Sequence, residues 1–155
     1  MKPIAIIGVG NYLRQDEGVG IHATQLLRKK IKRADCEIID AGVPSVALLH
    51  MLENRSLVII VDCADFAGQP GEIKTFQPEQ IKHEEKKEIS LHATDLMTVF
   101  EMAKSMGISL PSIFIIGIQP ETVEQGMELS EPVQKSLQNL PDLVKKILEE
   151  KIIRH

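Results

Sequence analysis

The chain has 155 residues, the length of a single domain, and residues 1–155 are therefore treated as one domain. Its composition, with 43% hydrophobic and 26% charged residues, excludes a disordered chain, a collagen-like fibre and a small scaffold held by disulfides. A net charge of -4 without any strongly basic segment argues against a nucleic-acid partner.

No segment predicts membrane insertion or export. The longest apolar runs, such as Leu57–Val61 and Ile113–Ile118, are far shorter than the ~18–20 residues that span a bilayer. The N-terminal residues lack the pattern of a secretory signal. Cys36 and Cys63 have neither a C-x-x-C nor a zinc-site spacing, so we interpret them as reduced core thiols. We expect a cytoplasmic protein that is a monomer.

The first part of the chain alternates strands and helices. A short apolar run predicts a strand at Pro3–Ile7, and apolar residues at helical spacing predict a helix at Gly18–Arg33. There follow, in chain order, a strand at Cys36–Asp40, a helix at Pro44–Asn54 and a strand at Leu57–Val61 that Asp62 ends.

The second part continues this alternation after an irregular stretch. We expect an edge strand at Glu72–Phe76 and a solvated loop at Lys82–Glu88, with docking of a partner as the alternative use of its charges. The remaining pattern predicts a helix at His92–Met106 with Ser90 as its N-cap, a strand at Ile113–Ile118, and helical structure from Ser130 that breaks at Pro141.

Continuously apolar strands separated by helices are typical of a buried parallel sheet with helices on both faces. The predicted fold is α/β, a three-layer α/β/α sandwich around a mainly parallel sheet of about five strands. Because sites in such sheets lie at the carboxyl ends of the strands, polar residues at that edge are the functional candidates.

Four candidates fall at the predicted carboxyl edge: Glu17, Asp40, Asp62 and His92. Each also has a structural interpretation: Glu17 as a partly exposed partner of a helix dipole, Asp40 and Asp62 as capping groups, and His92 as a packed imidazole. We interpret the neighbouring Asp16 as a helix N-cap. Carboxylates in one crevice repel each other unless a proton or cation intervenes. Two carboxylates and one imidazole suit nickel or zinc, with coordination left open for water or substrate.

A Rossmann-like nucleotide-binding module without protease activity is the alternative interpretation. Gly8-Val9-Gly10 follows a predicted strand and Asp40 ends the next one, as in dinucleotide-binding units. The third glycine of that pattern is replaced by Leu13, however. Asp16 and Glu17 would also repel a phosphate at the start of the helix.

The pattern Gly8-Val9-Gly10-Asn11-x-Leu13-x-x-Asp16-Glu17-x-x-Gly20 resembles the opening motif of the hydrogenase maturation proteases. The resemblance covers roughly residues 3–135. It continues in order through Asp40-Ala41-Gly42, Asp62, Ser90-x-His92 and Gly117-Ile118-Gln119-Pro120-Glu121.

The resemblance implies an α/β/α sandwich in which Glu17, Asp62 and His92 contact a metal and Asp40 is a further functional carboxylate. It implies an endopeptidase, a hydrolase that removes the C-terminal extension of a [NiFe]-hydrogenase large-subunit precursor after nickel insertion. The nickel is then supplied by the precursor, and zinc or cadmium is expected to substitute for it in vitro.

We expect Asp40, Glu17 and Asp62 to be catalytic, with Asp40 orienting or deprotonating the attacking water. Two interpretations of the metal follow. It polarises the scissile carbonyl or lowers the pKa of a bound water, or it acts as a checkpoint while carboxylate and water perform the chemistry. Val43 and Cys63 stand where the family often has Thr and Ala, which bears on substrate preference.

Overall fold

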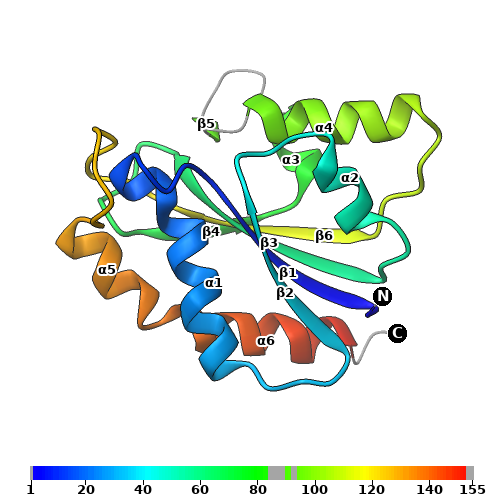
Figure 1. Ribbon diagram of the computed structural model, residues 1–155, viewed down its shortest axis with the longest axis horizontal. Coiled ribbons are helices and arrows are strands. Elements are labelled where there is room, and N and C mark those ends of the chain that lie inside the picture. The colour runs from blue at the N-terminus through cyan, green and yellow to red at the C-terminus, as the bar shows by residue number, and fades with distance from the viewer. Residues whose placement is uncertain (1, 84–89, 92–93, 153–155) are drawn as a thin grey trace.

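A mainly parallel sheet forms the centre of the molecule (Figure 1). The computed structural model describes residues 2–83, 90–91 and 94–152. Five strands lie side by side in the order β2 (Cys36–Gly42), β1 (Ile4–Val9), β3 (Leu57–Asp65), β6 (Ser112–Ile118) and β4 (Ile73–Phe76). Among these five strands the pairings are parallel except that of β4 with β6, which is antiparallel. A two-residue strand, β5 (Ser90–Leu91), pairs antiparallel with the end of β3. The predicted mainly parallel sheet is confirmed.

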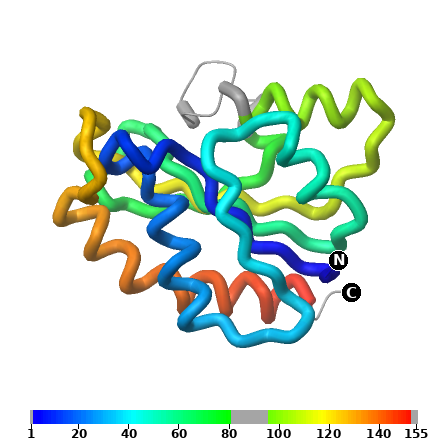
Figure 2. The backbone as a smooth tube through the Cα atoms, viewed as in Figure 1, coloured from blue at the N-terminus to red at the C-terminus, as the bar shows by residue number. Residues whose placement is uncertain are grey.

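Helices cover both faces of this sheet (Figure 1). One layer contains α1 (Val19–Lys30), α5 (Glu131–Leu137) and α6 (Leu140–Ile152). The other contains α2 (Ala47–Leu52), α3 (Pro78–His83) and α4 (Thr94–Ser105). Figure 2 shows that the chain returns along these layers between successive parallel strands, so that the carboxyl ends of the strands meet at one edge. The predicted three-layer sandwich is confirmed.

The strands are apolar throughout because both faces of the sheet are buried. In β1, Ile4 and Ile6 pack into the layer of α1 and α6, whereas Ala5 and Ile7 pack into the layer of α2 and α4. Both cysteines are buried and unpaired, as predicted. Among the described residues, none of the helices combines the length and apolar character needed to cross a membrane.

β3 is longer than predicted. It does not end at Asp62, because Asp62 and Cys63 continue the pairing with Gly117 and Ile118 of β6. Asp62 is therefore a strand residue and not a group that ends the strand. This extension carries its side chain into the interior of the carboxyl edge.

The segments around the first and third predicted helices also differ. A 3-10 turn, η1 (Gln15–Gly18), precedes α1, so the helix begins later than predicted, and no side chain caps either element. Ser90 is not an N-cap, because it pairs with Asp65 as part of β5 and α4 begins at Thr94. Lys82 and His83, predicted as loop, end α3, and residues 84–88 lie outside the described residues.

The last predicted helical region is confirmed as two helices. α5 ends at Leu137, and Pro141 stands in the first turn of α6, where its missing N–H leaves no helical hydrogen bond unmade.

Candidate active site

Glu17 lies in η1, between β1 and α1, and is almost fully buried. The expected partial exposure is wrong, because the chain doubles back: the N–H of Asn11 donates to the Glu17 carbonyl oxygen at 3.0 Å. Gly10 permits this approach, since its φ is +144° and a Cβ there would overlap the same carbonyl oxygen. Arg14 Nε lies 3.4 Å from Glu17 Oε2 and forms an ion pair with it.

Gly20 brings the start of α1 against the ends of two strands. A Cβ on Gly20 would overlap the backbone oxygens of Val9 in β1 and Val61 in β3. The start of α1 and the turn η1 before it therefore lie against the carboxyl edge of the sheet, close to Asp62.

Asp62 is also almost fully buried. Its Oδ1 accepts the N–H of Cys63 at 2.7 Å, whereas the buried Oδ2 has no hydrogen-bond partner among the residues that the structure describes. Burial raises the pKa of Asp62 well above the usual range of a carboxyl. The Cys63 N–H opposes this shift, and the negative charge of Glu17 adds to it.

The donor set suits a cation. Two buried carboxylates that repel each other are stabilised by a bound cation or proton, and Asp62 Oδ2 is an oxygen donor that the described part of the protein does not use. The predicted third ligand, His92, lies outside the described residues. Within the described ranges, no third His, Cys, Asp or Glu completes a metal-binding group.

Asp40 lies at the same edge in a different environment. Asp40 of β2 pairs with Gly8 of the neighbouring strand β1. On the other side of β1, Gly8 pairs with Val61 of β3, the residue before Asp62. The Asp40 carboxylate is exposed, and its Oδ1 accepts the N–H of Gly42 at 3.0 Å. Asp40 lines a surface hollow of about 430 Å³. The structure thus brings Glu17 and Asp62 together in the interior and leaves Asp40 at the surface.

The Asp16 carboxylate connects η1 to the loop after β6. Asp16 is fully buried, and its Oδ2 accepts the N–H groups of Glu121 (2.9 Å) and Thr122 (3.1 Å) and the hydroxyl of Ser130 (2.7 Å). Its Oδ1 accepts the N–H of Ser130 at 2.8 Å. The predicted N-cap role of Asp16 is wrong, because this carboxylate fastens loop 119–130 to the turn that carries Glu17.

Gln119 fastens a second loop to the end of β6. Its Oε1 accepts the N–H groups of Phe66 (2.9 Å) and Gly68 (3.1 Å), and its Nε2 donates to Asp65 Oδ1 at 3.1 Å. The motif at residues 117–121 thus organises the loops around the site. Sequence reasoning placed Asp16 and Gln119 within the family motifs but missed that their side chains attach loops to the site. The available signal was the position of the motif at residues 117–121 directly after a predicted strand.

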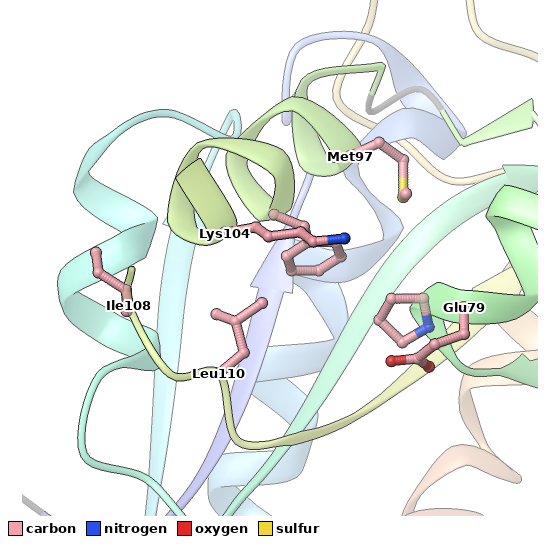
Figure 3. Close-up of a pocket in the computed structure, with 7 residues that line it drawn as sticks. Glu79, Met97, Lys104, Ile108 and Leu110 are labelled. Carbon is pink, nitrogen blue, oxygen red and sulfur yellow. The ribbon is translucent and has the colours of Figure 1, made fainter. Parts of the chain in front are cut away.

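A separate hollow of about 410 Å³ lies between α3 and α4 (Figure 3). Glu79 lies on one side of it and Lys104 and Met97 of α4 on the other, with Ile108 and Leu110 from the segment after α4. None of the predicted site residues that the structure describes lines this hollow, so it is distinct from the carboxylate pair.

Comparisons with known proteins agree on one family. A family model described as "Hydrogenase maturation protease" matches residues 21–150. The hydrogenase expression/formation protein HoxM of Azotobacter vinelandii is 30% identical over 138 residues, which are 87% of this chain and 67% of that protein. The hydrogenase maturating endopeptidase HybD from Escherichia coli has a TM-score of 0.82 at 25% identity, with 97% of this chain and 94% of that chain covered. The maturation protease HycI from Thermococcus kodakarensis has a TM-score of 0.75 at 26% identity, with 96% and 93% covered.

The fold and these matches define a hydrolase of the endopeptidase class. The chain belongs to the hydrogenase maturation protease family, and its role is that of an endopeptidase in hydrogenase maturation. The alternative of a nucleotide-binding module is rejected. Two N–H groups of the glycine loop, those of Gly10 and Asn11, are also not available to a phosphate, because they donate to the carbonyl oxygens of Gly42 and Glu17.

Proposed function

We propose that this chain removes the C-terminal extension of a [NiFe]-hydrogenase large-subunit precursor after nickel insertion, acting as a monomer in the cytoplasm. The observation that carries the proposal is the buried carboxylate pair of Glu17 and Asp62 at the carboxyl edge of the sheet. Arg14 forms an ion pair with Glu17, but the buried Asp62 Oδ2 has no hydrogen-bond partner among the described residues. An acid buried in this way beside a second carboxylate is costly to ionise unless a further cation joins the pair. A precursor that carries nickel supplies that cation.

Glu17, Asp62 and His92 are the residues that would hold the nickel of the precursor. Two carboxylate oxygens and one imidazole nitrogen are donors that nickel and zinc both accept, so zinc or cadmium is expected to bind in its place in vitro. When bound, the metal supplies Lewis-acid polarisation of a carbonyl.

Asp40 is the residue proposed to orient and deprotonate the attacking water. Support comes from its exposure at the same edge as the buried pair, which gives it access to solvent. The N–H of Gly42 fixes the direction of the carboxylate by donating to its Oδ1. A carboxylate held in this way can accept a proton from water in the course of the attack.

Replacing Glu17 tests the proposed role of the pair. Glu17→Gln keeps the size of the side chain but removes a charged oxygen ligand, so processing of the nickel-loaded precursor should fall more than about tenfold. The rate is measured on gels as the shift of the precursor to its shorter form. Glu101→Gln, at an exposed position on α4, is the matched control and should process at the normal rate. Normal processing by a folded Glu17→Gln variant, with the fold checked by circular dichroism, would contradict the proposal.

A further inference from the structure

Large apolar side chains are exposed around the candidate site. Leu13 (60% exposed), Val43 (55%), Val46 (54%) and Met127 (54%) follow β1, β2 and β6 at the carboxyl edge, and we call them the apolar rim. In the described part of the chain, Met106 (63% exposed) is the one other large apolar side chain that is comparably exposed, and Ile152 is less so (36%). Apolar surface that gathers in one place marks an interaction site more often than scattered single residues do.

The apolar rim borders the hollow that contains Asp40. Leu13 and Val43 line this hollow of about 430 Å³ together with Tyr12, while Gln25 and Asp40 supply polar groups. It lies at the end of β2, one of the two edge strands of the sheet, where an extended polypeptide can approach without displacing a neighbouring strand. The combination of apolar walls and one carboxylate suits an aliphatic side chain with its peptide group beside Asp40.

Contacts between two loops hold the part of the apolar rim that contains Leu13 and Met127. The N–H of Gly126 donates to the carbonyl oxygen of Leu13 at 2.9 Å, which joins the segments that carry Leu13 and Met127. The Tyr12 ring stacks on His22 at 5.0 Å, and His22 Nε2 lies 3.2 Å from the Met127 carbonyl oxygen. A preformed surface loses less conformational entropy on binding than a flexible one.

We propose that the apolar rim binds aliphatic side chains of the large-subunit precursor in the extended segment next to the bond that is cut. This inference rests on the proposed function. Asp40 and the net charge of -4 disfavour an acidic segment at this place, and the lining of Leu13 and Val43 favours an uncharged aliphatic one. Val43, which lines the hollow together with Asp40, thereby becomes a residue that determines substrate preference.

The test removes the apolar character of the rim without adding charge. A double variant, Leu13→Gln with Val43→Gln, should bind the nickel-loaded precursor about tenfold more weakly, since each substitution removes an apolar contact at an exposed position. Binding is measured by titration calorimetry, and cleavage is measured in parallel on gels. Met106→Gln, at a similarly exposed position in the turn after α4, is the matched control and should bind like the unmodified protein.

The two readouts separate this inference from the proposed function. Unchanged affinity of the double variant for the precursor would contradict the proposed binding role of the apolar rim, whether or not cleavage occurs. Precursor that binds in a rim-dependent way but is never cut would support the rim and count against the proposed function. Absence of precursor binding by the unmodified protein would contradict this role as well, because the precursor is the proposed partner of the apolar rim.

Discussion

Asp62 and Asp65 lie on the same strand but have carboxyl groups in opposite environments. Burial raises the pKa of Asp62 well above its usual range. The N–H of Ala67, and then the side chain of Gln119, lower the pKa of the exposed Asp65 by donating hydrogen bonds to its carboxylate. At the scale of residues, local burial and donors decide the chemistry of a carboxylate, and these two residues make opposite predictions for stability.

Asp62→Asn should stabilise the metal-free protein near pH 7 while it abolishes processing. The folded protein resists ionisation of Asp62, whereas the unfolded chain ionises it at the usual pKa near ~3.9. The protonated Asp62 carboxyl therefore contributes to the stability of the folded protein below the unfolded-state pKa. This contribution is lost as the pH rises from that value toward the raised pKa of the folded protein. The advantage of the variant should shrink as the pH falls toward ~4. Urea unfolding between pH 4 and 8, with a chelator present, measures this difference.

Asp65→Asn is the matched control with the opposite sign. Its lowered pKa means that ionisation of Asp65 stabilises the fold above the usual carboxyl pKa, and that this stability is lost as the pH falls. The Asp65→Asn variant should therefore be less stable than the unmodified protein near pH 7. An Asp62→Asn variant that is less stable at every pH would contradict the assigned environment of Asp62.

At the scale of elements, the site depends on two loops and a short turn packed on the ends of the strands. The turn η1 carries Glu17, and loop 119–130 is fastened to it by Asp16. Gln15 has a positive φ of 48° and donates its N–H to the Gly126 carbonyl oxygen at 2.8 Å, so the turn itself is held from the same loop. Loss of this attachment should affect both folding and the position of Glu17.

Asp16→Ala should lower the free energy of unfolding by about 2–4 kcal/mol, because three partly buried backbone N–H groups and one hydroxyl lose their acceptor. Ser130→Ala removes only the hydroxyl donor and should cost about 1 kcal/mol. Urea denaturation of the two variants measures both values. An Asp16→Ala variant with unchanged stability would show that these hydrogen bonds do not hold the loop.

At the scale of the molecule, the sequence was sufficient to predict the layers and the edge at which the site lies. The buried runs of β1, β3 and β6 contain too many apolar residues for any exposed face, so their place in a central sheet was predictable. The end of β3 could not be predicted in the same way, because Asp62 is polar and continues the strand only through pairing with β6. The role of Asp16 depends on residues more than a hundred positions away in the chain, which no local pattern reveals.

The central claim is that the Glu17–Asp62 pair makes cleavage depend on nickel carried by the precursor. The decisive measurement compares two preparations of the same large-subunit precursor, with and without nickel, incubated with the purified protein and resolved by gel shift. The account predicts that the nickel-loaded form is shortened and that the nickel-free form stays intact. Equal cleavage of both forms would contradict nickel recognition, and cleavage of neither form by the folded protein would contradict the proposed processing reaction itself.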